Sequence, residues 1–320
     1  MAKVKTFKTI FPAVSVPLND DYSINEPEFR AYLRWIKTFY GKGMDGLVCN
    51  GHTGEITGLT RAERKRVVEI CAEECGDVMT IISGVNCENT AESIEMAKEA
   101  KEAGADGILL MPPHMWLRFG MNPDAPFEYV KDVAEGADID IIIHLYPATS
   151  KAFYPVETLI KMCKEIDHVK CIKMGTRVTS IYEHDVRLLR QECPDISLIT
   201  CHDETLCVSW FPGMDGALIG FAGCVPEIIC PAREVFANPD KHTLKEAQDW
   251  SDRIYHISQA IYGGGQPSGE AHARLKEALK QRGIFKSALM RKPVLPLNDE
   301  EKAWVALGLE RSQLPEVDMT

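Results

Sequence analysis

The chain has 320 residues, of which 45% are hydrophobic, 26% charged and 8% aromatic, a composition typical of globular proteins and not of disordered ones. Its 47 acidic and 36 basic residues give a formal net charge of -11, which disfavours a general nucleic-acid binder because phosphate backbones attract positive surfaces. It has no apolar run near the ~20 residues that cross a bilayer and no signal-peptide pattern, and its eleven cysteines form no CxxC pair, so we expect a cytoplasmic protein without structural disulfides.

Short apolar runs alternate with longer charged segments through the first two thirds of the chain. The apolar runs lie near Ile10 and at residues 46–49, 79–82, 107–111, 141–146, 169–173, 197–201 and 216–220. The intervening segments, such as 60–74 and 89–106, cluster their apolar residues on one helical face. Thr60 and Glu63 form a capping-box pattern, and Gly104 stands where a helix is expected to end. Eight strand-helix units in this length predict an α/β fold of the (β/α)8 barrel type, with a doubly wound open sheet as the alternative.

The pattern changes after Pro226, where helical periodicity continues without intervening strands. We therefore divide the chain into a barrel at residues 1–225 and, at 226–320, the last barrel helix followed by a C-terminal α-helical extension of three helices. The glycine-rich stretch 262–269 is interpreted as a loop between two helices. A GxGxxG match at 41–46 closes a predicted helix and precedes a strand, the reverse of the context that a dinucleotide site requires.

The active site of such a barrel lies at the carboxyl ends of its strands, and polar residues follow the second strand at 50–55. This loop reads Asn-Gly-His-Thr-Gly-Glu, and its two glycines flank His52 and Thr53. Glycines let backbone amides approach a carboxylate or phosphate closely. An ordinary strand-helix turn remains an equally good interpretation of the loop alone.

Two further strand ends carry reactive side chains. Tyr146 follows the fifth strand, where its phenol is expected to shuttle protons once a neighbouring cation lowers its pKa. Lys173 ends the sixth strand and alternates with Val169 and Cys171. If these three point into the barrel, burial disfavours the ammonium form of Lys173 and makes it a nucleophile toward a ketone. The alternative is a lysine whose amine reaches solvent.

Together these residues resemble the dihydrodipicolinate synthase / N-acetylneuraminate lyase superfamily of Schiff-base lyases, over most of the chain. The likeness lies in the loop Gly51 to Glu55, in Tyr146, in Lys173 and in the segment 212–223 around Gly220. It implies that Lys173 forms an imine with pyruvate or a related 2-oxo acid and that Tyr146 moves protons. It also implies that His52, Thr53 and Gly54 bind the substrate carboxylate, with no metal or organic cofactor.

Departures from the family pattern bear on the substrate. His52 replaces the Ser or Thr that is usual at this position of the loop, so the residues that bind the carboxylate or those that relay protons must be arranged differently. The stretch 112–116 replaces a tyrosine pair of dihydrodipicolinate synthases, one of which completes their relay across a subunit boundary, and it resembles hydratase-aldolases of aryl-substituted 2-oxo acids. His114 and Trp116 are therefore candidate pocket residues. Lys151 is a candidate for binding a distal anionic group of the substrate. The alternative is that Lys151 is a solvated loop residue.

We expect a carbon-carbon lyase, most simply an aldolase acting on pyruvate and an aldehyde. A sugar-acid dehydratase that uses the same imine is the alternative, and a non-catalytic metabolite-binding barrel is the alternative of another class. The resemblance implies a homotetramer, and neither nucleic acid nor a membrane is an expected partner.

Overall fold

The structure is a computed structural model that describes residues 3–263 and 269–319. Within these residues the strands are β1 (Ile10–Pro12), β2 (Gly46–Cys49), β3 (Thr80–Val85), β4 (Gly107–Leu110), β5 (Asp140–His144), β6 (Val169–Met174), β7 (Ser197–Thr200) and β8 (Gly216–Ile219). They pair in parallel in the order β1-β8-β7-β6-β5-β4-β3-β2. A parallel bridge between Ala13 and Val48 joins β1 to β2. The (β/α)8 barrel is thereby confirmed, and the open sheet is excluded.

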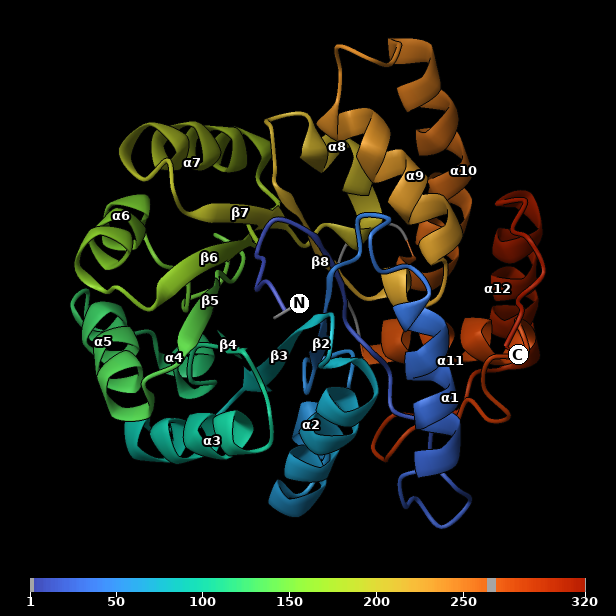
Figure 1. Cartoon of the computed structure of the whole chain (residues 1–320), viewed down its shortest axis with the longest axis horizontal. Helices are drawn as coiled ribbons and strands as arrows, with labels where there is room; N and C mark the ends of the chain where they lie inside the picture. The colour runs from blue at the N-terminus through green and yellow to red at the C-terminus, as the bar shows by residue number, and fades with distance from the viewer. Residues whose placement is uncertain (1–2, 264–268, 320) are drawn as a thin grey trace.

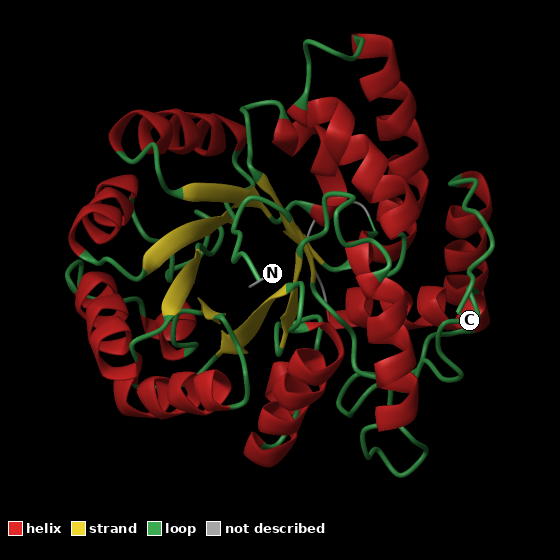
Figure 2. Ribbon diagram, viewed as in Figure 1, coloured by secondary structure: helices red, strands yellow, loops and turns green. Residues whose placement is uncertain are grey.

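The α-helices surround the strands as an outer ring (Figures 1 and 2). Those of the described barrel are α1 (Glu26–Lys37), α2 (Arg61–Cys75), α3 (Thr90–Glu102), α4 (Met115–Phe119), α5 (Ala125–Ala137), α6 (Val156–Glu165), α7 (Thr179–Glu192), α8 (Leu206–Trp210) and α9 (Pro226–Ala237). Short 3-10 helices η1 (Ile56–Gly58), η2 (Asp203–Thr205) and η3 (Phe221–Gly223) occupy loops that follow β2, β7 and β8. Helix α4 is likewise short and follows β4, so the carboxyl ends of these strands carry the elaborated loops.

Local signals in the sequence explain where several helices begin and end. Thr60 and Glu63 form the predicted capping box of α2, with both reciprocal hydrogen bonds present, and this satisfies two backbone donors of the first turn. Asn25 and Asn89 cap α1 and α3 through their side chains. Gly104 follows the end of α3, as predicted.

The first strand is shorter than its apolar run. Regular pairing covers Ile10–Pro12 alone, although the buried run continues to Leu18. Proline has no backbone N–H to donate to a neighbouring strand. Beyond Pro12 the Ala13 amide still donates to the Ile219 carbonyl at 3.1 Å and the Val14 amide to the Val48 carbonyl at 2.9 Å, and the run then continues as buried loop.

The C-terminal extension comprises α10 (Leu244–Tyr262), α11 (Gly269–Gln281) and α12 (Asp299–Arg311) in the described part of the chain, which confirms the helical nature of this region. Helix α10 packs on α9 and α12, and α11 packs on both α10 and α12. In Figure 1 the three helices lie together on one side of the barrel. Most of the predicted loop 262–269 lies outside the described residues, and the domain boundary at 225 remains a prediction.

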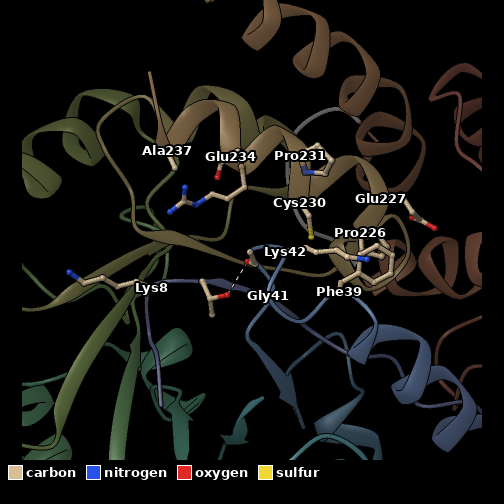
Figure 3. A pocket seen from close by; sticks show the side chains of 13 residues that line it. Lys8, Phe39, Gly41, Lys42, Pro226, Glu227, Cys230, Pro231, Glu234 and Ala237 are labelled. Carbon is tan, nitrogen blue, oxygen red and sulfur yellow. Dashed lines mark hydrogen bonds between the residues drawn. The ribbon is translucent and has the colours of Figure 1, made fainter. Parts of the chain in front are cut away.

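The GxGxxG match lies at the amino-terminal ends of the strands. Gly41 and Gly43, with φ of +74° and +95°, belong to the loop that leads from α1 into β2. A cavity of about 680 Å³ lies beside this loop and α9 (Figure 3). The Thr9 hydroxyl there donates to the carbonyl of Gly43 at 2.9 Å. Strand β2 follows the loop, so the match is a helix-end turn and not a fingerprint that opens a helix.

Candidate active site

The predicted site residues meet at the carboxyl ends of neighbouring strands. Strands β5 and β6 pair so that His144 lies opposite Lys173, and the Leu145 amide donates to the Lys173 carbonyl at 3.1 Å. Tyr146 follows directly and comes within 3.3 Å of His52 in the loop after β2. The barrel therefore brings together residues that lie up to 121 positions apart in the sequence (173 − 52).

Lys173 has the environment that a nucleophilic amine requires. Its side chain is partly exposed, so a substrate can reach it, yet the surrounding protein lowers its pKa through burial. The charge of Arg177 lowers this pKa further, whereas Cys201 and the carboxyl group of Asp203 oppose the shift. A larger fraction of the amine is thus neutral near pH 7 than for a solvated lysine.

The Tyr146 phenol is buried, and burial raises its pKa. This corrects the expectation that a nearby cation would lower it, because the charges that act on the phenol come from Tyr129 and Glu88 and raise its pKa as well. Tyr146 is therefore a neutral hydroxyl. It can donate or pass on a proton, and it does not act as a phenolate base.

Imidazole rings surround this phenol. The Nε2 atoms of His52 and His114 each lie 3.3 Å from the Tyr146 hydroxyl, and the ring of His144 lies 4.9 Å from the tyrosine ring. Burial, together with the charges of Lys173, His272 and His114, lowers the pKa of His52 to about 3. Burial also lowers the pKa of His144 far below its ordinary value. At least these two rings are uncharged at neutral pH.

The loop that carries His52 and Thr53 is tightly turned and anchored from outside the barrel. The Glu55 amide donates to the carbonyl of His52 at 3.0 Å, and Gly54 is so close to the carbonyl of Val14 that a side chain would lie 3.0 Å from it. The Glu55 carboxylate forms an ion pair with Lys276 of α11. The C-terminal extension thus fixes the predicted carboxylate-binding loop.

A buried carboxyl group, which the sequence analysis missed, lies opposite this loop. Asp203 begins η2, separated from the end of β7 by two residues, and accepts hydrogen bonds from the amides of Gly220 (2.8 Å) and Phe221 (3.3 Å). Burial raises the pKa of Asp203 to about 6, although a hydrogen bond from Tyr262 partly offsets the shift. A β-carbon on Gly220 would lie 2.3 Å from the Tyr262 hydroxyl and 3.2 Å from Thr53 Oγ1. Gly220 is thus the point where α10, β8 and the Thr53 loop converge.

Two other missed residues complete the surroundings of Lys173. The Arg177 guanidinium pairs with Glu204 at 2.6 Å and also donates to the Gly175 carbonyl at 2.9 Å. His272 of α11 is partly buried, and its pKa is lowered by burial and by the charges of Lys276 and Lys173. The strand-end rule could have found Asp203 and Glu204, which follow the seventh apolar run, but no local pattern marks His272.

Two of the predicted substrate-binding residues, Trp116 and Lys151, contact residues other than Lys173 and Tyr146. The Trp116 ring is buried, with its centroid 5.7 Å from that of Tyr129 and 6.2 Å from that of Tyr154, so it packs among other aromatic rings. Lys151 is exposed and donates to the carbonyl of Arg118 at 3.2 Å. Their roles in substrate binding remain predictions.

Comparison with known proteins places this geometry in a family. The model of the dihydrodipicolinate synthetase family matches residues 6–311. A 4-hydroxy-tetrahydrodipicolinate synthase of Bartonella bacilliformis is 26% identical over 309 residues, covering 96% of this chain and 98% of the relative. An uncharacterised DapA-like lyase of Thermofilum pendens is 25% identical over 292 residues, covering 91% and 92%.

Solved structures show the same fold at lower sequence identity. YagE, a prophage protein of the dihydrodipicolinic acid synthase family from E. coli K12 solved in complex with pyruvate, superposes with a TM-score of 0.85 at 21% identity, covering 97% of this chain and 99% of that one. Dihydrodipicolinate synthase from Aquifex aeolicus gives a TM-score of 0.84 at 19% identity, covering 98% and 100%. Among the described residues, none of the helices has the length and hydropathy needed to cross a membrane.

Proposed function

Because the chain belongs to the dihydrodipicolinate synthetase family, a family of carbon-carbon lyases, we propose that it is a class I aldolase in which Lys173 forms an imine with pyruvate or a related 2-oxo acid. The observation that carries this proposal is the placement of Lys173. Lys173 is a partly exposed residue near the carboxyl end of β6, beside the neutral imidazoles of His52 and His144, and burial lowers its pKa. A nucleophilic lysine needs this combination of access and desolvation.

The reaction begins when the neutral amine attacks the keto carbon of the substrate. The resulting carbinolamine loses its hydroxyl group as water, and we assign to the Tyr146 hydroxyl the supply of the proton that this step needs. The protonated imine then withdraws electrons from the adjacent carbon, which allows a carbon-carbon bond to form or break there. The substrate carboxylate lies in the loop 51–55, where the Thr53 hydroxyl and backbone amides are the available donors.

The residues around Tyr146 suggest which kind of aldehyde is the second substrate. His114 lies 3.3 Å from the Tyr146 hydroxyl and Trp116 is buried nearby in the sequence, whereas dihydrodipicolinate synthases carry a tyrosine pair in this stretch. We therefore favour an aldehyde with an aryl or otherwise extended substituent, as in the hydratase-aldolases. Lys151 is a candidate for a distal anionic group. Release of an aldehyde from the adduct supports this assignment, whereas loss of water without carbon-carbon cleavage indicates the sugar-acid dehydratase instead.

The proposal includes a cellular setting. Imine chemistry is complete with the lysine itself, so we propose no metal or organic cofactor. All eleven cysteines lie in the described part of the chain and are free, which supports a reducing compartment such as the cytoplasm. We also propose a homotetramer, from the resemblance alone. One of the solved structures of similar fold is described as a monomeric dihydrodipicolinate synthase variant.

Reductive trapping tests the imine directly. Incubation with pyruvate and borohydride is expected to add one covalent mass to the protein, located on Lys173 by peptide mass spectrometry. Lys173→Ala should lose the adduct. Lys170→Ala is the matched control, because Lys170 lies on the same strand with an exposed side chain. Absence of any adduct on the wild-type protein would overturn the proposal in favour of a metabolite-binding barrel.

A further inference from the structure

We propose that the cavity at the amino-terminal ends of the barrel strands binds a small organic anion that has a carboxylate or phosphate group and an apolar body. This cavity lies between the glycine-rich turn 41–43, which leads into β2, and helix α9 (Figure 3). Lys173 lies near the carboxyl ends of the strands, so the two sites are at opposite ends of the barrel. The inference is therefore independent of the proposed function.

The cavity has the size and the lining of a small-molecule site. Its volume is about 680 Å³, within the range of roughly 300–1,000 Å³ that is usual for ligand pockets, which are mostly apolar and carry a few polar groups. The apolar part of the lining consists of Phe39, Pro226, Cys230, Pro231 and Ala237. A side chain at Gly41 or Gly43 would meet no other atom within 4 Å. Bare backbone with open space in front of it therefore forms one side of the cavity.

Three cationic side chains line this cavity without a carboxylate partner. Lys8, Lys42 and Arg233 form no ion pair with any carboxylate in the described part of the chain. The Lys42 amine lies 5.4 Å from the centroid of the Phe39 ring, and in Figure 3 the Lys8 side chain extends from the other end of the cavity. Both lysines are exposed, so an anion can reach their amines.

The carboxylates beside the cavity already have partners. Glu227 forms an ion pair with Arg282 at 2.8 Å, and Glu234 accepts a hydrogen bond from the side chain of Asn238 at 2.8 Å. Asp45 accepts from a backbone amide of the glycine-rich turn at 2.9 Å. The lining thus has a positive balance of charge, although the whole chain has a net charge of -11. A local excess of cations in an acidic protein favours an anionic ligand at this place.

Arg233 is the residue that points most directly to such a ligand. It is half-buried, and its guanidinium donates to the backbone carbonyl of Asp215 at 2.7 Å, while the carboxylate of Asp215 pairs with Arg190. Burial lowers the pKa of Arg233 and outweighs the opposing charges of Asp215 and Glu234, as expected for a cation without a close counter-ion. A guanidinium has five N–H donors in a planar fork that fits a carboxylate or a phosphate. Most of these donors remain available to a ligand.

The two parts of the lining together define the ligand. The anionic group binds the Arg233 fork, with the lysines adding attraction, and the apolar body packs against Phe39 and the prolines of α9. Burial raises the pKa of the Cys230 thiol to about 12, so this residue is a neutral part of the wall and not a nucleophile. An anion without an apolar body would leave this wall in contact with water, and we therefore expect it to bind more weakly.

Isothermal titration calorimetry with four probes tests the site. Phenyl phosphate and phenylacetate carry the two candidate anionic groups on an apolar ring, and inorganic phosphate and acetate are the references without a ring. At least one aryl probe is expected to bind once per chain and at least tenfold more tightly than its reference, and the preferred probe identifies the anionic group. Arg233→Gln should raise its Kd by ~10-fold or more, the order expected for the loss of a hydrogen bond to a charged group. Arg233→Lys should also bind more weakly than wild type, because an ammonium lacks the planar fork.

Further variants separate this cavity from the rest of the protein. Lys42→Gln changes an exposed side chain, which keeps the test valid if Arg233→Gln does not fold, and it should raise the Kd by ~3-fold or more. Lys241→Gln is the matched control, because it removes the same charge from an exposed residue that does not line the cavity. Lys173→Ala should bind the probe within twofold of wild type. Aryl probes that bind no more tightly than their references, or equal affinities in Lys42→Gln, Arg233→Gln and Lys241→Gln, would overturn the proposal. Loss of binding in Lys173→Ala alone would place the probe in the active site and would also overturn it.

Discussion

The buried ion pair between Glu55 and Lys276 offers a direct test of how the C-terminal extension supports the site. Lys276 is 1% exposed, and the side chain of Glu55 is 8% exposed. The lysine also donates to the carbonyl of Leu289 at 2.9 Å, and Glu55 Oε2 accepts from the Arg291 amide at 3.3 Å. Replacement of Lys276 by Met keeps the volume and removes the charge, which leaves the carboxylate buried without its cation.

The expected cost follows from the burial of both partners. Removal of one member of a buried pair destabilises a protein by about 3–5 kcal/mol, because the remaining charge loses its compensation. An unfolding entropy of ~2.1 cal/mol/K per residue corresponds to roughly 0.67 kcal/mol/K for 320 residues. Lys276→Met is therefore expected to lower the midpoint of thermal unfolding by about 4.5–7.5 °C. The double variant Glu55→Gln/Lys276→Met should recover most of that loss, because it removes both charges.

The single variant Lys276→Met should also weaken substrate binding, because Glu55 ends the loop that holds His52 and Thr53. We expect the pyruvate concentration for half-maximal borohydride trapping to rise by about tenfold, which corresponds to about 1.4 kcal/mol. Differential scanning calorimetry and the trapping titration measure the two effects. Lys280→Met is the control, one turn further along α11 with an exposed side chain. A midpoint within 1 °C of wild type, or a double variant no more stable than the single one, would refute this account of the pair.

Four further predictions concern the residues around Lys173. In the folded protein the pKa of the Asp203 carboxyl is raised to about 6 from its ordinary 3.8. The stability that this group contributes is therefore present below pH 3.8 and is lost as the pH rises through 6. Asp203→Asn should raise the unfolding midpoint more at pH 8 than at pH 5, and equal shifts at the two pH values would contradict this. Loss of the same negative charge should shift the pH profile of imine formation at Lys173 to lower pH in stopped-flow trapping, and an alkaline shift would disagree. Gly220→Ala places a methyl group against the Tyr262 hydroxyl and should raise the pyruvate concentration for half-maximal trapping at least tenfold, whereas unchanged binding would show that the convergence at Gly220 is not needed. The Cε1 proton of His52 should show no titration in NMR between pH 5 and 8, because its pKa is about 3, and a midpoint near 6.5 would be inconsistent with its burial.

The fold could be predicted because its signals are local and repeated. Each strand is a short buried run and each helix has one apolar face, so the alternation of the two identifies the barrel without knowledge of any contact. Exceptions occur where a single residue overrides the pattern. Regular pairing of β1 covers only Ile10–Pro12 of a longer apolar run, and within it Pro12 has no N–H to donate to a neighbouring strand.

The predicted site was located by one geometric rule, that strand ends converge at one rim of the barrel. Lys173, Tyr146 and His52 follow from that rule and from their chemistry. Asp203 follows from the same rule and was overlooked, because a carboxylate after a strand is common in turns. His272 could not be found in this way, since it lies on a helix whose packing against the barrel depends on contacts far apart in sequence.

The direction of the pKa shift at Tyr146 shows what a sequence leaves undetermined. A tyrosine near a reactive lysine suggests a phenol acidified by a cation, but the charges and the burial around Tyr146 raise its pKa instead. A neutral phenol that contacts two imidazoles can relay protons without ever holding a full charge. The chemistry of this site therefore depends less on one acidic or basic group than on the alignment of the Tyr146 hydroxyl with the imidazoles of His52 and His114. That alignment depends in turn on the loop that carries His52, which Glu55 anchors to α11 outside the barrel.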